Sequence, residues 1–159
     1  MKSHLLYFEI DLPHFQTHKI PATIPIMLDI KEILKSYSLN PKNSIVVGSG
    51  ILNALDLRES NDIDITVRQT TYNRLSKLPE FKIKKTSGSD ILTSDTLEIG
   101  TSLAVPNHTY SFKELFENSV VIDQVRYIKL ELLLDIKKQW DRDKDKKDIK
   151  IIEKYLQSN

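Results

Sequence analysis

The chain has 159 residues, of which 40% are hydrophobic and 28% charged, a composition that fits one globular domain and excludes disorder throughout. Lys and Arg total 23 against 22 for Asp and Glu, and this balance excludes a strongly basic coat that binds any nucleic acid. Because there is no cysteine, disulfide scaffolds, thiolate metal sites and cysteine nucleophiles are excluded as well.

Targeting signals are the next feature that the chain constrains. No apolar run approaches the roughly 20 residues that span a bilayer. The short apolar stretch at the N-terminus is interrupted by Glu9 and Asp11 before a signal-peptide core develops. The lack of cysteine also suits a reducing compartment. We therefore expect a cytoplasmic protein with no membrane partner.

The expected secondary structure alternates between strands and helices. Short β-branched or alternating runs predict strands, and apolar residues that recur every three or four positions predict helices. The expected strands are residues 4–10, 44–47, 62–67, 81–84, 96–99, 120–122 and 125–128. The expected helices are residues 26–40, 51–57, 70–78, 111–118, 130–140 and 145–156. The clearest strand is 62–67, where polar and apolar residues alternate without a break.

Two local patterns sharpen this assignment. Ser111 followed by Glu114 three residues later is typical of a capping box at the start of a helix. A Ser/Gly/Asp-rich stretch between 84 and 96 is expected to be a loop. The interleaving predicts an α/β or α+β fold, with a small mixed sheet flanked by helices. We expect a single domain over 1–159, made of an N-terminal segment (1–43), a core (44–128) and C-terminal helices (129–159).

The first candidate for chemistry is a pair of carboxylates. Asp62 and Asp64 are two residues apart in a strand, so their side chains project from the same face, while Ile63 and Ile65 point into the core. Two such carboxylates repel each other unless a cation lies between them. Oxygen ligands of this kind suit Mg²⁺, which often takes further ligands from substrate phosphates. The alternative is that both are ordinary solvent-facing residues.

The second candidate is the turn that precedes this strand by one short helix. Gly48 permits a close backbone approach to a phosphate, and Ser49 offers a hydroxyl and an amide at an expected helix N-terminus. No Gly-Lys-Ser/Thr follows, so the turn is not a Walker loop. Gly50 directly after Ser49 also departs from the Gly-x-Ser-x-Gly elbow of serine hydrolases. Taken alone, the turn is better explained as an ordinary strand-to-helix connection.

Together the two features resemble a known family. Val47-Gly48-Ser49, then twelve residues, then Asp62-Ile63-Asp64-Ile65 is similar to the motif of the polymerase-β-type nucleotidyltransferase superfamily. The resemblance implies the nucleotidyltransferase fold and a third carboxylate between hydrophobic residues on a later strand. Glu98, between Leu97 and Ile99, is the candidate for that role, and Asp95 is the alternative.

The C-terminal third supports a narrower resemblance, to the AbiEii-like and related minimal nucleotidyltransferases. A leucine-rich helix carrying Lys137 is followed by Arg142, a Lys-Asp pair ending in Asp145, and Asp148. The resemblance implies a nucleotide contact for Lys137 and a polar, catalytic or binding part for Asp145 and Asp148. The alternative is that this charge-dense helix is a solvated face with i,i+4 ion pairs.

The resemblance therefore implies a metal-dependent nucleotidyltransferase. Asp62, Asp64 and Glu98 would be the catalytic and metal-binding residues for one or two Mg²⁺ ions, and an NTP such as ATP the donor. Gly48, Ser49, Lys137, Asp145 and Asp148 would bind the nucleotide. The acceptor stays open between a small molecule, a protein and a tRNA. Two alternatives are a nucleotide-binding protein without turnover and an interaction module with a cognate partner, as in a toxin–antitoxin pair.

One further pair of residues is a candidate metal site. His14 and His18 are four apart, a spacing that places two side chains on one helical face. Pro13 and Pro21 lie close on either side, and no third ligand is evident in the sequence. The pair therefore carries no functional prediction.

Overall fold

The computed structural model describes residues 29–159 of the chain. Three sequence predictions lie outside these residues: the strand at 4–10, the beginning of the helix at 26–40, and the His14–His18 pair. The other predicted elements lie within residues 29–159.

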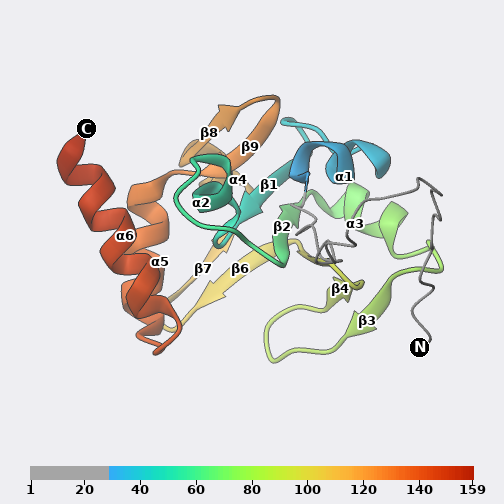
Figure 1. The fold of residues 1–159 in the computed structure, drawn as a ribbon. Helices are drawn as coiled ribbons and strands as arrows, with labels where there is room; N and C mark the ends of the chain where they lie inside the picture. Colours follow the sequence, from blue (N-terminus) through green and yellow to red (C-terminus); the bar gives the residue numbers. More distant parts are fainter. Residues whose placement is uncertain (1–28) are drawn as a thin grey trace, which may run out of the picture.

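A seven-stranded mixed sheet forms the centre of the fold (Figure 1). Its strands are β1 (Ser44–Val47), β2 (Ile63–Val67), β3 (Lys82–Lys84), β4 (Ile91–Thr93), β5 (Leu97–Gly100), β8 (Ser119–Ile122) and β9 (Val125–Ile128). The spatial order is β3-β4-β5-β2-β1-β9-β8. β2 is antiparallel to β1 and parallel to β5, and β1 is parallel to β9, whereas the other neighbours are antiparallel. The α+β class is therefore as expected.

Three strands were not expected from the sequence. β4 lies in the stretch predicted to be a loop, and β6 (Ser102–Val105) pairs with β7 (His108–Ser111) as a separate two-stranded sheet. β4 lies among Ser, Gly and Asp residues, which favour turns and loops, so its three residues do not stand out in the sequence. β4 is held by pairing with β3 on one side and β5 on the other. The loop prediction for this stretch was wrong at those three residues.

The helices are those that the periodicity predicts within residues 29–159, and most are shorter than expected. They are α1 (Ile30–Ser36), α2 (Gly50–Ala54), α3 (Gln69–Leu75), α4 (Phe112–Glu117), α5 (Leu130–Trp140) and α6 (Asp145–Ser158). The capping box is confirmed, because the Ser111 side chain accepts from the Glu114 amide and the Glu114 side chain accepts from the Ser111 amide. Both α1 and α2 are followed closely by residues with positive φ, Ser38 and Asp56, which stop the helical path early.

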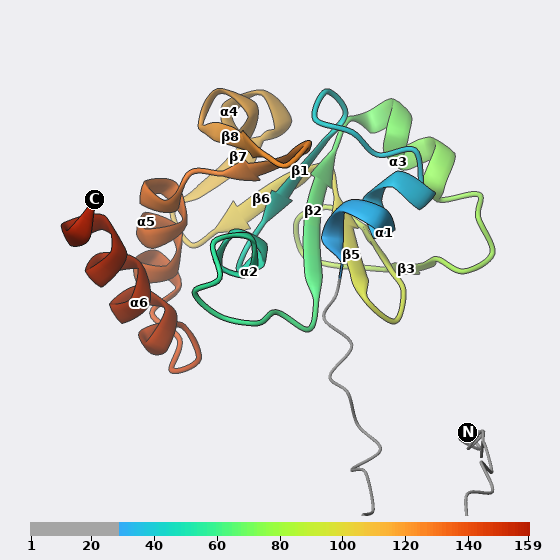
Figure 2. The same ribbon diagram turned by 45° about the horizontal axis from the view of Figure 1, so that its top comes forward.

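The core forms between the sheet and its helices. β1 is buried along its whole length, and Ile63 and Ile65 of β2 are 0% and 2% exposed, so they face inward as predicted. Leu133 and Ile136 of α5 belong to the same buried cluster. Figure 2 shows α5 and α6 lying together on one side of β1 and β2, with α1 and α3 on the other. The face of β2 that carries Asp64 is thereby left to line a cleft.

Candidate functional site

A cleft of about 650 Å³ lies where the β1–α2 turn, β2, β5 and the two C-terminal helices converge. Its size falls within the range of about 300–1,000 Å³ that is usual for small-molecule sites. The sequence-predicted residues all line it: Gly48, Ser49, Asp62, Asp64, Glu98, Lys137, Asp145 and Asp148. Tertiary structure thus brings together candidates that were chosen from segments far apart in the chain.

One wall of the cleft carries the carboxylates. β2 and β5 run parallel with Asp64 directly opposite Glu98, and Asp62, in the bend just before β2, lines the same cleft. Burial raises the pKa of Asp64, and the nearby charges of Glu98 and then Asp62 raise it further, to about 6. Lys144 and Lys137 act in the opposite direction. This wall therefore holds like charges together without neutralising them.

The position of the third carboxylate follows from the strand register. Glu98 is the partner of Asp64 across the β2–β5 pair, whereas Asp95 lies in the turn that precedes β5. Both residues line the cleft, but only Glu98 is among the charges that shift the pKa of Asp64. The Glu98 side chain is 47% exposed, and its Oε1 is 3.7 Å from the Lys84 Nζ. The register favours Glu98 over Asp95.

Gly48 packs directly against the carboxylate wall. Its φ is +69°, and a Cβ atom there would be 2.7 Å from Oδ2 of Asp64. Such a contact is closer than real Cβ atoms make, and the backbone conformation already disfavours any L side chain. Glycine at this position is therefore explained by the approach of Asp64 as well as by the turn itself.

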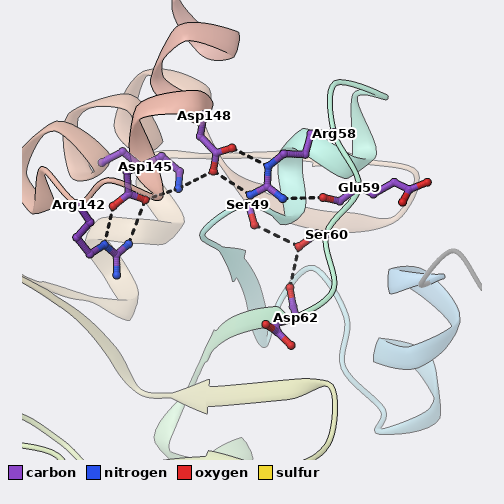
Figure 3. A network of polar contacts seen from close by, with 9 residues as sticks. Ser49, Arg58, Glu59, Ser60, Asp62, Arg142, Asp145 and Asp148 are labelled. Atoms are coloured by element: carbon purple, nitrogen blue, oxygen red, sulfur yellow. Dashed lines mark hydrogen bonds and ion pairs between the residues drawn. The ribbon is translucent and has the colours of Figure 1, made fainter. Parts of the chain in front are cut away.

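Ser49 lies at the N-terminus of α2, as predicted. Its hydroxyl makes no capping bond to the helix and lies 3.2 Å from the hydroxyl of Ser60. Ser60, which is 8% exposed, donates to the backbone carbonyl of Asp62 at 2.9 Å. The two serines therefore connect the β1–α2 turn to the loop that leads into Asp62 (Figure 3).

The opposite wall is a chain of alternating charges centred on Lys137. This side chain, on α5, is 6% exposed, and its Nζ lies 2.9 Å from Oδ1 of Asp145 and 2.9 Å from Oδ2 of Asp148. Arg58 donates to Asp148 through Nε at 2.6 Å and Nη2 at 2.9 Å. Arg142 donates to Asp145 through Nε at 2.6 Å and Nη2 at 3.1 Å (Figure 3). Both arginines make bidentate pairs, the geometry that guanidinium groups favour with carboxylates.

Burial and pairing oppose each other at the two aspartates of this wall. Asp145 and Asp148 are 1% and 2% exposed, and burial alone would raise the pKa of each carboxyl. Hydrogen bonds from Arg142 and Lys137 to Asp145, and from Arg58 and Lys137 to Asp148, outweigh that effect and lower both pKa values. The alternative of a solvated helical face was therefore wrong for these two residues.

Two arginines of this wall were not selected as site residues from the sequence. Arg142 stood in the C-terminal pattern, so its spacing from Asp145 was an available signal. Arg58 had no such signal, because its partner Asp148 lies 90 residues further along the chain. Trp140 also lines the cleft, with the guanidinium carbon of Arg142 4.1 Å from its ring centroid.

A divalent cation can be tested against the carboxylate wall. Within residues 29–159, no group of three or more His, Asp or Glu side chains is arranged to hold a metal ion. Mg²⁺ commonly uses only one or two protein carboxylates and completes its shell with water and phosphate oxygens. Burial and the two neighbouring carboxylates make the ionised form of Asp64 unfavourable. A cation bound by Asp64 and Asp62 would relieve this cost. The residues present therefore fit Mg²⁺ as a metal shared with a substrate.

Comparison with known proteins adds no relative. No protein-family model, curated protein or solved structure matches the chain. In the part of the chain that the structure describes, no helix is both long enough and apolar enough to cross a membrane. Because no relative is found, only the residues of the cleft indicate a function.

Proposed function

We propose that the chain is a Mg²⁺-dependent nucleotidyltransferase, which transfers a nucleoside monophosphate from an NTP to an acceptor hydroxyl and releases pyrophosphate. The observation that carries the proposal is that one cleft is lined both by a cluster of carboxylates and by a cluster of cations. One wall gathers the carboxylates Asp62, Asp64 and Glu98, and the other gathers fixed cations. A triphosphate with its metal ion needs both kinds of group at once.

The carboxylate wall would hold the metal and receive a proton. Asp62 and Asp64 are the proposed Mg²⁺ ligands, with Glu98 beside them as the third carboxylate. When bound, Mg²⁺ supplies positive charge to the triphosphate and lowers the pKa of an oxygen bound to it. Glu98, half-exposed in the cleft, is placed to accept the proton of the acceptor hydroxyl. The acceptor oxygen then forms a bond to the α-phosphorus, and the bond to pyrophosphate breaks.

The cationic wall would receive the phosphates. Arg58, Lys137, Arg142 and Lys144 line the cleft with four positive charges against the two negative charges of Asp145 and Asp148, a local excess of two. Because Lys137 is buried between two carboxylates, it contributes charge to the wall, while Lys144 offers an exposed ammonium group to the phosphates. Asp145 and Asp148 act as positioning residues that hold the cations. Gly48 and Ser49 close the phosphate end of the cleft.

A second candidate is an NTP-binding protein that does not transfer nucleotides. It is favoured by one observation: Oε1 of Glu98 lies 3.7 Å from Nζ of Lys84, so the carboxylate already has a partner that competes with an acceptor hydroxyl. Such a protein would still bind NTP through the same two walls. A cytoplasmic location and a cognate partner protein both stay predictions.

Calorimetry of NTP binding with and without Mg²⁺ tests the proposal without knowledge of the acceptor. The parent is compared with an Asp62→Asn, Asp64→Asn double variant, and with Asp95→Asn as a control that also lines the cleft. We expect Mg²⁺-dependent binding by the parent and the control, and none by the double variant. No binding by the parent at millimolar NTP would contradict both candidate functions.

A transfer assay separates the two candidates. The parent and Glu98→Gln are incubated with NTP labelled at the α-phosphate and with fractionated cell extract as the source of acceptors. Transfer of label by the parent but not by Glu98→Gln supports the enzyme. Binding of Mg²⁺–NTP without transfer to any fraction supports the nucleotide-binding alternative.

A further inference from the structure

The cleft contains one feature that phosphate binding leaves unused. Trp140 ends α5, and Arg142 follows two residues later with its guanidinium carbon 4.1 Å from the centroid of the indole ring. We propose that Arg142, supported by Trp140, is a stacking platform for the nucleobase of the bound nucleotide. This inference rests on the proposed function, because it assigns the base subsite of the same cleft.

The local backbone explains how the two side chains meet. On a regular helix, residues i and i+2 project in different directions. Here α5 stops at Trp140 because Asp141 takes a left-handed conformation, with φ +46° and ψ +36°. The chain reverses at this residue, which allows Arg142 to fold back over the indole. Asp tolerates this conformation better than most residues do.

The guanidinium is then fixed from a second direction. Asp145, which is 1% exposed, accepts from Nε and Nη2 of Arg142 along one edge of the group. Asp145 is itself held by the Lys137 ammonium at 2.9 Å. The indole on one side and the buried carboxylate along one edge therefore leave Arg142 little freedom. A platform that is fixed before the ligand arrives loses less entropy on binding.

The remaining surface of Arg142 is the part that a ligand would meet. Its side chain is 41% exposed and lines the cleft, as Trp140 does. The Nε–Nη2 edge is the fork with which arginine grips a phosphate, and Asp145 already occupies it. Apart from this edge, a ligand can meet the flat cationic face of the guanidinium group, which stacks well on aromatic bases. Lys144, two residues further on, is the better phosphate contact on this side of the cleft.

The expected ligand selectivity follows from stacking. Every base has a flat π surface, so such a platform accepts all four bases, and purines are expected to bind more tightly than pyrimidines because they cover more area. No hydrogen bond to a base edge is implied. The chemical class of ligand is therefore a purine-containing NTP, with adenine and guanine close to equal.

Calorimetry with two ligands that differ only in the base provides the test. Mg²⁺–ATP is compared with Mg²⁺–ribose 5′-triphosphate in the parent, in Arg142→Lys and in Arg74→Lys, which replaces an arginine outside the cleft lining. We expect the parent and Arg74→Lys to bind ATP about 10-fold more tightly than ribose triphosphate. In Arg142→Lys, which keeps the charge but not the flat surface, that advantage should disappear while the affinity for ribose triphosphate stays within about 2-fold.

Each other outcome overturns a distinct claim. Equal binding of the two ligands by the parent would contradict a base subsite at this place. An equal loss of both ligands in Arg142→Lys would identify Arg142 as a phosphate contact instead. Failure of the parent to bind either ligand would contradict the proposed function itself.

Fluorescence of the parent gives a second readout that needs no variant. The chain has one tryptophan, so its emission reports on Trp140 alone. We expect ATP to change the emission and ribose triphosphate to leave it nearly unchanged. The same response to both ligands would contradict the proposed platform.

Discussion

The two walls of the cleft both contain partly or fully buried aspartates, but the pKa values of these aspartates shift in opposite directions. On the carboxylate wall, Asp62, Asp64 and Glu98 are like charges, and their proximity and burial raise the pKa of Asp64 to about 6. On the cationic wall, Asp145 and Asp148 are more deeply buried, yet their pKa values are lowered because each accepts hydrogen bonds from two cations. Burial is thus not the property that separates the walls.

The difference lies in whether these aspartates are paired: within residues 29–159 Asp64 has no ion-pair partner, whereas Asp145 and Asp148 each have two. A paired network is stabilising only while every member is present, since removing one leaves a buried charge alone. An unpaired cluster is costly to the folded state and is relieved by an external cation. The aspartates of the cationic wall are therefore already paired in the free protein, whereas the carboxylate wall is stabilised when it binds a cation. Three substitutions test this contrast.

The largest effect is expected for Lys137→Met. The variant removes the shared partner of two buried carboxylates, and breaking a buried pair in this way typically costs about 3–5 kcal/mol. Urea unfolding of the parent and variant measures the loss. Lys138→Met is the matched control, because Lys138 is 51% exposed and its pair with Glu153 is a surface pair, which is worth at most about 1 kcal/mol. Equal losses of stability in the two variants would contradict a larger contribution from the buried network than from the surface pair.

A smaller effect of opposite sign is expected for Asp64→Asn in the absence of divalent cations. The pKa of Asp64 in the folded state, about 6, exceeds its ordinary value of 3.8. The folded state therefore becomes less stable as the pH rises from about 4 through 6, and the variant avoids this loss. We expect the variant to be more stable than the parent by about 1–3 kcal/mol at pH 8, and equally stable below pH 4.

The same measurement carries its own control. Asp62 is exposed, so Asp62→Asn should change the free energy of unfolding much less than Asp64→Asn does. Unfolding by urea with a chelator at pH 4 and pH 8 provides all the required values. A parent whose stability equals that of Asp64→Asn at both pH values would show that Asp64 is not under electrostatic strain.

The smallest effect on stability is expected for Gly48→Ala. Alanine at φ +69° costs about 1–2 kcal/mol, and its Cβ would also push against Oδ2 of Asp64. Gly88→Ala is the control, because a Cβ there meets only Ala104 at 4.0 Å and should be neutral or slightly stabilising. Thermal unfolding compares the two. Since Asp64 must move, Gly48→Ala should also weaken Mg²⁺-dependent NTP binding, while Gly88→Ala should leave it unchanged.

Prediction from the sequence succeeded where local periodicity carried the information. The alternation in 62–67 predicted the strand, which begins one residue later, at Ile63. Asp62 therefore lies in the bend before the strand, although it lines the same cleft as Asp64. Leu97 and Ile99 likewise indicated that Glu98 points away from the core, and Glu98 is the exposed residue between them. The roles of these residues stay predictions until the metal and NTP are tested.

The missed elements share a different cause. The missed strands are held by pairing rather than by a strong local pattern: β4 pairs with β3 and β5, and β6 pairs with β7. Asp145 and Asp148 were recognised as polar residues of a helix, but their spacing could not say whether that helical face was solvated or buried. Nothing in the local sequence around Arg58 indicated a partner 90 residues away.

The sequence by itself determined the helices, most of the strands and the glycine turn before Asp62, because each depends on neighbours a few residues away. Only the tertiary structure decided that Glu98 lies opposite Asp64, that Arg58 and Lys137 share Asp148, and that Arg142 folds over Trp140. The physical reason is the distance along the chain over which each feature is determined. Backbone periodicity acts within one element, whereas the pairing and burial of a charge depend on which distant elements pack around it.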